Sequence, residues 1–102
     1  MTYVLGVRFE WDPQKERQNV AKHGVSFKEA KALFTSKRDF LEIFDAEHSD
    51  VEERFIAIGP IRRGLVLVVF TERSEDTIRI ISARWASKTE RALYVDYMEK
   101  DT

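Results

Sequence analysis

The sequence of 102 residues contains no cysteine, which excludes disulfide bonds and thiolate metal sites. It has only two histidines, and this disfavours a zinc site, because Zn²⁺ usually takes three or four protein ligands of a few types. No apolar run approaches the roughly 18 residues of a membrane span. The first residues also lack the basic segment and the apolar stretch of a secretory signal. We therefore expect a cytoplasmic protein with no membrane segment.

An excess of charge of one sign is also lacking, because 17 Lys and Arg stand against 18 Asp and Glu, for a formal net charge of −1. Nucleic-acid binding therefore has to rest on a local patch rather than on net charge. The charge is segregated along the chain: residues 60–91 hold seven basic and four acidic residues, whereas residues 45–54 hold five acids and one arginine. An anion-binding surface is expected in the second half of the chain.

The apolar residues, 43% of the chain with seven Phe, are enough for the core of one small domain over residues 1–102. Alternation of apolar and polar residues predicts a first strand over Val7–Trp11. Asp12 and Pro13 then supply an N-cap and a first helical residue, and Gly24 is expected to end this helix after His23.

The rest of the chain predicts two helices with capping boxes and four strands. These are a helix from Ser26 to about Ser36, strands at Phe40–Phe44, Phe55–Ile58, Leu65–Phe70 and Ile78–Arg84, and a helix opening at Ser87–Glu90. Leu65–Phe70 is apolar on both faces, so we expect it at the centre of the sheet, with a helix packed on each face. The order β-α-α-β-β-β-β-α predicts an α+β fold, a small antiparallel sheet packed with helices.

The arginines of the last hairpin are candidates for phosphate binding. If the turn spans Ser74 to Asp76, Arg73 faces Thr77 and Thr71 faces Arg79. Arg73 and Arg79 then lie diagonally on one face of the sheet, so that both can hold one phosphate. Arg84 and Arg91 flank the start of the last helix, where Lys88 and free backbone amides favour an anion. The alternative is that these arginines form ordinary ion pairs with the acidic segment.

The segment NVAKHG, residues 19–24, has two interpretations. Lys22 and His23 face the negative end of the helix dipole, and cations followed by glycine are typical of a helix C-terminus. A protonated His23 is also a candidate general acid, because imidazole titrates near neutral pH. Metal binding is the least favoured chemistry: Glu52, Glu53 and His48 form the only group considered, and we expect neither a metal nor another cofactor.

Three stretches carry a family resemblance: FEWDPQKERQNVAKHGVSFKEAKALF, DAEHSDVEER and IRIISARWASKTERALY. Their motifs, among them K-H-G-V-S-F, H-S-x-x-E-E-R and I-S-A-R-x-A-x-x-x-E-R-x-x-Y, occur in one order over roughly residues 8–94, and this pattern resembles the BrnT ribonuclease toxins. The resemblance implies a fold similar to RelE and a toxin of a type II toxin–antitoxin pair, neutralised by a BrnA-type antitoxin that binds operator DNA. It also implies metal-free RNA cleavage through the ribose 2′-hydroxyl, with a base, an acid and cations around the phosphate.

The motifs carry over residue by residue as candidate roles. The catalytic candidates are Lys22, His23, Glu53, Arg54, Arg79 and Arg84; the candidates for binding RNA or phosphate are Arg73, Ser82, Trp85, Lys88 and Arg91. Two positions depart from the family pattern. Phe70 stands where a tyrosine is expected, and Trp85 replaces a basic residue with a stacking surface.

Two alternatives to a ribonuclease remain open at this point. One is a toxin-like subunit that acts without catalysis as a co-repressor with its antitoxin. The other is a protein-interaction domain whose arginines are structural. Whether the chain is a ribonuclease toxin or a non-catalytic co-repressor, we expect its antitoxin to cover the surface of Arg73, Arg79, Arg84 and Trp85.

Overall fold

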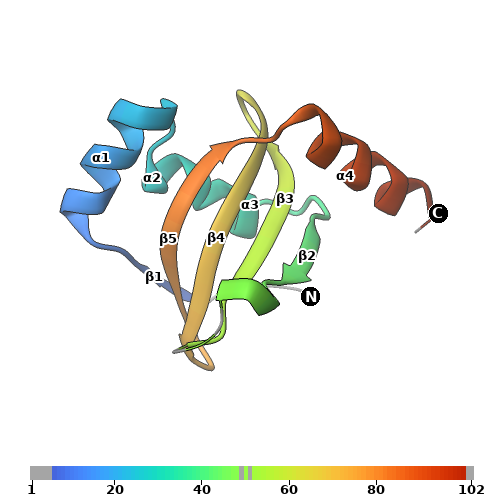
Figure 1. The fold of residues 1–102 in the computed structure, drawn as a ribbon. Coiled ribbons are helices and arrows are strands. Elements are labelled where there is room, and N and C mark those ends of the chain that lie inside the picture. The colour runs from blue at the N-terminus through green and yellow to red at the C-terminus, as the bar shows by residue number, and fades with distance from the viewer. Residues whose placement is uncertain (1–5, 49, 51, 101–102) are drawn as a thin grey trace.

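The computed structural model describes residues 6–48, 50 and 52–100, and within them the chain forms one five-stranded sheet in the order β1-β5-β4-β3-β2 (Figure 1). The strands are β1 (Arg8–Glu10), β2 (Leu41–Phe44), β3 (Phe55–Ile61), β4 (Gly64–Ser74) and β5 (Thr77–Trp85). The expected domain of residues 1–102 includes residues 1–5, 49, 51 and 101–102, which lie outside the described residues. The α+β class is confirmed, and β4 lies at the centre as its apolar sequence predicted.

The sheet is antiparallel except at one edge. β1 pairs with β5 in parallel, whereas the β2–β3, β3–β4 and β4–β5 pairs are antiparallel. A wholly antiparallel sheet was expected, and β1 is the exception because it pairs with the last strand of the chain. The helices that follow β1 carry the chain to the opposite edge, where β2 lies.

The helices are α1 (Pro13–His23), α2 (Phe27–Ala30), α3 (Ala32–Thr35) and α4 (Lys88–Lys100), and η1 (Ala46–His48) is a short 3₁₀ turn. The predicted caps of α1 are confirmed: Asp12 accepts from the Gln14 amide, and Gly24 adopts φ 73°. The helix expected to run from Ser26 to Ser36 is divided at Lys31, whose carbonyl accepts from the Phe34 amide three residues on. None of the helices in the described residues is long and apolar enough to cross a membrane.

The main core lies on one face of the sheet. In Figure 1, α2 and α3 lie behind the sheet and α1 lies beside β5. Buried apolar side chains from α2 and α3 meet those of the sheet there, and the largest are Phe27, Leu33, Phe34, Val66, Val68, Phe70, Ile78 and Ile80. Burial of this apolar surface is the main favourable contribution to the stability of the domain.

The first helix is joined to the sheet by a buried polar side chain. Asn19 of α1 donates to the carbonyl of Val25 at 2.8 Å and to that of Ala83 in β5 at 2.7 Å. Its side-chain oxygen also accepts from the Ala83 amide at 3.2 Å. α1 has few apolar residues, so this set of hydrogen bonds replaces the apolar stripe by which a helix usually packs.

The opposite face of the sheet, called the open face below, has little cover. Ile58, Leu65 and Leu67 are buried on it, and Tyr94 of α4 packs against them. None of the thirteen residues of α4 is buried, and Leu93 is 49% exposed. Figure 1 shows α4 extending away from the sheet. The expectation of a helix packed on each face therefore holds for one face only, because α4 covers just one end of the other.

Candidate functional site

The open face carries three polar residues of β5 because this strand has a bulge. Arg84 pairs with Leu67, Ser82 with Val69, and Arg79 with Thr71. Arg84 lies five positions after Arg79, an odd spacing that would put the two side chains on opposite faces of a regular strand. The register shifts between Val69 and Phe70, which leaves Ile81 as an extra residue and returns Arg79 to the face of Arg84.

Two arginines meet one carboxylate at the β1 edge of the open face. In the parallel pair of β1 and β5, Glu10 lies directly opposite Arg79. Arg79 Nη1 lies 3.5 Å from Glu10 Oε2, and Arg73 Nε lies 3.6 Å from Glu10 Oε1. The structure thus brings Arg73 and Arg79 together, and a carboxylate lies between them where a phosphate was expected.

The hairpin of these arginines differs from the predicted one in its turn. Thr71 faces Arg79 as expected, but Ser74 rather than Arg73 faces Thr77. The turn has only two residues, 75 and 76, and a second register shift between Glu72 and Ser74 places Arg73 at a bulge. The predicted pairing of Arg73 with Thr77 is therefore wrong, although Arg73 still reaches the group that contacts Arg79.

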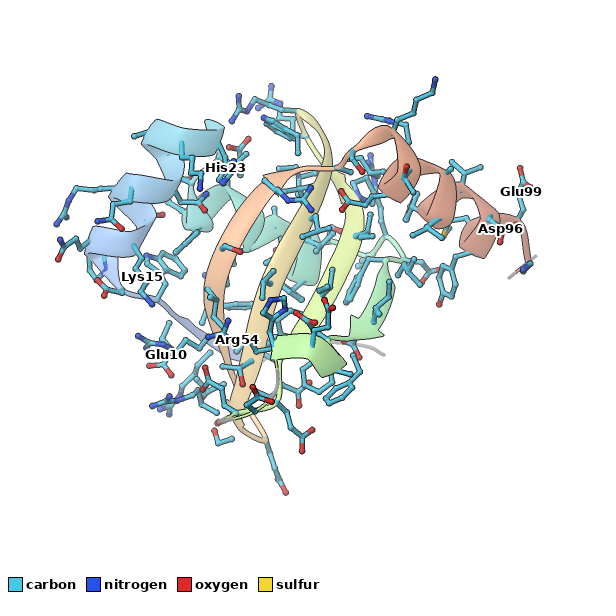
Figure 2. The ribbon with its side chains drawn as sticks, viewed as in Figure 1. Glu10, Lys15, His23, Arg54, Asp96 and Glu99 are labelled. Carbon is cyan, nitrogen blue, oxygen red and sulfur yellow. The ribbon has the colours of Figure 1, made fainter. Side chains whose placement is uncertain are left out.

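The E-E-R motif lies next to this cluster. The hydroxyl of Thr71, the residue opposite Arg79, donates to the Glu53 carbonyl at 2.7 Å. Arg54 directly precedes β3, and its Nη2 lies 3.8 Å from Glu52 Oε1. Figure 2 shows Arg54 across the front of the sheet, on the same side of the molecule as Glu10. The Glu53 side chain is exposed, so Arg54 is the residue of this pair that lies over the sheet.

Arg84 is held by a carboxylate of α4. Its two terminal nitrogens each lie 2.7 Å from an oxygen of Glu90. This hydrogen-bonded ion pair lowers the pKa of Glu90 to about 2 and raises that of Arg84. Glu90 also accepts from the Ser87 amide and donates its own amide to the Ser87 hydroxyl, which confirms the predicted capping box. A carboxylate therefore occupies the helix N-terminus at which a phosphate was expected.

The other phosphate-binding candidates near α4 lie apart from Arg84. Trp85 follows Arg84 in β5 and so points to the core face, where it packs against the main core. The Arg63 guanidinium lies 5.0 Å from the centre of its ring. Lys88 and Arg91 are exposed in the first turn of α4, and neither makes a side-chain ion pair with another described residue.

Lys22 and His23 end α1, as the helix signals predicted. Lys22 is exposed and His23 half-buried, and their side chains make no hydrogen bond or ion pair with another described residue. Figure 2 shows His23 at the upper end of α1, whereas Glu10 lies beside the lower half of the sheet and Arg54 lies over it. The structure therefore does not bring the K-H-G motif together with the Glu10 cluster.

Phe70, which stands where the family pattern has a tyrosine, lies in the core and not on the open face. Phe70 is fully buried, with its ring centre 4.9 Å from that of Phe34 and 5.6 Å from that of Phe55. A hydroxyl at this position would enter the main core, so its absence removes nothing from the open face.

A group of possible metal ligands in the described residues is Asp45, Glu47 and His48 of the segment around η1. It differs from the group considered in the sequence, His48 with Glu52 and Glu53. His48 Nδ1 lies 2.9 Å from Asp45 Oδ2, within hydrogen-bond distance. This contact accounts for the closeness of the two side chains without an ion between them.

Glu10 is the residue of the site that sequence reasoning missed. Its place on the polar side of the first strand was visible, because Phe9 and Trp11 flank it. The pairing of β1 with β5, which puts Glu10 beside Arg79, joins residues about 70 positions apart in the chain. Local patterns carry no signal for such a contact.

Comparison with known proteins gives one family. Residues 11–90 match the family model described as the ribonuclease toxin BrnT of a type II toxin–antitoxin system. Among solved structures, the chain is similar to the crystal structure of the Brucella abortus ribonuclease toxin BrnT, with a TM-score of 0.60 and 27% sequence identity. The match covers 80% of this chain and 99% of that one. No curated protein matches the sequence.

Proposed function

Because the chain belongs to the family of BrnT ribonuclease toxins of type II toxin–antitoxin systems, we propose that it cuts RNA on the open face of its sheet, without a bound metal ion. The ribose 2′-hydroxyl attacks the adjacent phosphorus, and the cations of the site stabilise the charge that develops on the phosphate oxygens. The observation that carries this proposal is the gathering of Arg54, Arg73 and Arg79 around one end of that face.

The contacts of the arginines favour different roles for them, namely phosphate binding or the positioning of α4. Arg73 and Arg79 lie 3.5–3.6 Å from Glu10, beyond the usual range of a charge-assisted hydrogen bond, so their N–H groups remain available to a phosphate. Arg54 and Ser82 extend this surface across the sheet. Arg84 uses two terminal nitrogens on Glu90, so we assign to it the positioning of α4 before any contact with RNA.

The remaining candidate residues are proposed to act around the edge of this surface, as a proton donor, as a structural support or in binding flanking nucleotides. His23 or Lys22 is the proposed proton donor to the leaving 5′ oxygen if RNA extends to the end of α1. Glu53 contributes through its backbone carbonyl, which holds Thr71. Trp85, Lys88 and Arg91 lie near the start of α4 and are proposed to bind flanking nucleotides.

The metal-free chemistry is supported by the kind of donors in the site. Guanidinium groups predominate there, and cations of this kind replace a metal ion in stabilising a crowded phosphate. Mg²⁺ sites are built mainly from carboxylate oxygens and water, whereas Glu10 already lies between two arginines.

The open face also fits an antitoxin. Type II systems pair a toxin with a protein antitoxin, and we propose a BrnA-type partner in a hetero-oligomer that binds operator DNA through the antitoxin, in the cytoplasm. Ile43 of β2 is 36% exposed and pairs with Ile56 on the same face as Arg79 and Arg84, so an amphipathic acidic segment would meet apolar and cationic groups together. Trp85 points to the other face, so this cover would centre on the arginines.

The test is RNA cleavage by the free protein in EDTA, analysed for 2′,3′-cyclic phosphate ends. We expect cleavage to persist in EDTA and to fall in an Arg79→Ala variant with an unchanged melting temperature. Loss of cleavage in EDTA with recovery in Mg²⁺ would show a metal-dependent enzyme.

A non-catalytic co-repressor is the second candidate, because carboxylates already lie close to four of the candidate arginines, Arg54, Arg73, Arg79 and Arg84. If the free protein leaves RNA intact under all conditions, but strengthens operator binding by its antitoxin, this candidate replaces the ribonuclease.

A further inference from the structure

We propose that the Glu10 carboxylate is the general base that takes the proton from the ribose 2′-hydroxyl. The inference rests on the ribonuclease function proposed above and adds the residue that starts the reaction. In the described residues, Glu10 is the carboxylate that the open face places against two arginines at once.

The backbone positions Glu10 for this role. β1 is held against β5 in parallel register, with Phe9 packed on the main core and Glu10 on the opposite side, facing Arg79. A base for the 2′-hydroxyl has to lie next to the cations that bind the phosphate, because the attacking 2′ oxygen and the phosphorus on the 3′ oxygen are carried by the same ribose. Glu10 meets this requirement with Arg79 from β5 and Arg73 from β4.

The contacts of Glu10 differ from those of a structural carboxylate. Glu90 makes two hydrogen bonds of 2.7 Å to Arg84 and caps α4, and its side chain is 20% exposed. Glu10 stands at 3.5 and 3.6 Å from its arginines, and its side chain is 42% exposed. A base needs free oxygen lone pairs and access to substrate, and Glu10 has both.

The reaction is balanced with water as the only co-reactant. The Glu10 carboxylate accepts the 2′ proton, the 2′ oxygen forms a bond to phosphorus, and the bond between phosphorus and the 5′ oxygen breaks. The 5′ oxygen takes a proton from water, directly or through the donor proposed above. The products are a 2′,3′-cyclic phosphate and a 5′-hydroxyl, and protonated Glu10 returns its proton to the hydroxide left by that water.

Several charged groups lie around Glu10. Arg79 faces it from β5, Arg73 from β4, and Arg8 lies two residues before it in β1, near Asp76. Lys15 of α1 lies above Glu10 in the view of Figure 2. The proposed base therefore lies among the cations that would bind the phosphate.

The experiment compares Glu10→Gln with wild type in single-turnover cleavage of an RNA oligonucleotide. Binding is measured separately with a fully 2′-O-methylated RNA, which lacks the nucleophile. We expect Glu10→Gln to cut about 100- to 10,000-fold more slowly and to bind the methylated RNA no more weakly. Glu75→Gln removes a charge in the exposed turn after β4 and should cut at the wild-type rate.

A Glu10→Gln protein that cuts as fast as wild type or faster would overturn the proposal and would show that Glu10 only screens the arginines. A parallel loss of binding would overturn it as well, since Glu10 would then act by holding the arginines in place. If Glu10→Gln fails to fold, Glu10→Asp decides: a slower rate with unchanged binding of the methylated RNA supports the base, and an unchanged rate contradicts it. Failure of wild type itself to cut RNA would instead contradict the proposed function.

Discussion

Arg79 and Arg84 lie on the same strand and the same face, yet their guanidinium groups meet carboxylates in different ways. Arg84 is locked to Glu90 by two hydrogen bonds of 2.7 Å, whereas Arg79 lies 3.5 Å from Glu10. The first pair joins β5 to α4, and the second lies open at the edge of the sheet. We therefore expect Arg84 to act mainly in structure and Arg79 to contact the ligand.

This difference predicts opposite phenotypes for two alanine variants. Arg79→Ala should slow RNA cleavage about 100- to 1,000-fold, because it removes a donor to the developing charge, with little change in stability. Arg84→Ala should lower the free energy of unfolding by about 1 kcal/mol, an amount reduced by the partial exposure of the pair. Cleavage rates and urea denaturation of both variants measure this, and a stable Arg84→Ala protein with no activity would contradict the assignment.

The Arg84–Glu90 pair also predicts how stability depends on pH. The pKa of Glu90 falls from an ordinary 4.5 to about 2 in the folded protein, so the folded state holds its proton less tightly than the unfolded state. The stabilisation is therefore complete above pH 4.5 and is lost as the pH falls from 4.5 towards 2. Denaturation of wild type and Glu90→Gln should show a stability difference at pH 6 that shrinks by pH 3.

Two other carboxyl groups also make the stability depend on pH in the acid range. The effect of Glu90 therefore has to be measured as the difference between wild type and Glu90→Gln. The Arg63 hydrogen bond lowers the pKa of Glu29, and the hydroxyls of Ser74 and Thr77 lower that of Asp76. Both contributions are present in wild type and variant and cancel in the difference. A difference that stays constant between pH 6 and 3 would contradict the role given to Glu90.

Asn19 should be among the most sensitive positions to substitution. Asn19→Ala would leave the buried Val25 and Ala83 backbone groups without their partners, so we expect a loss of about 3 kcal/mol in the free energy of unfolding. The neighbouring Gln18→Ala, exposed on the same helix, should change it by less than about 0.5 kcal/mol. Equal effects of the two substitutions in urea denaturation would show that these hydrogen bonds contribute little.

Gly59 is predicted to tolerate no side chain. A Cβ there would lie 2.6 Å from Leu33 Cδ1 and 2.7 Å from Phe40 Cβ. Gly59→Ala should therefore cost about 1–3 kcal/mol through overpacking. In a double-mutant cycle, Leu33→Ala should relieve part of this cost, so that the two substitutions together destabilise by less than their sum; strict additivity would argue against the clash.

Features determined by neighbouring residues could be predicted from the sequence. The caps at Asp12 and Gly24, the capping box at Ser87 and the central place of Leu65–Phe70 depend on local chemistry or on one apolar run, and all are confirmed. Local rules also placed Arg79 opposite Thr71.

The remaining features depend on contacts between distant residues. A bulge such as that at Ile81 changes the face of every residue beyond it, and no periodicity rule places it in advance. The partnership of Glu10 with Arg79 depends on the edge to which β1 returns, and that of Arg63 with Glu29 depends on the approach of a turn to a helix. The arginines of the candidate site were thus visible in the sequence, whereas Glu10 and the geometry of the site were not.

The sparse packing of α4 divides the molecule into two units of unequal cooperativity. All buried core residues among those described precede residue 84, and a helix of thirteen residues has marginal stability on its own. Its amide hydrogens should therefore exchange through local opening, without global unfolding of the sheet. A protease should therefore cut first in this helix, while the main core, to which α4 contributes no side chain, stays folded.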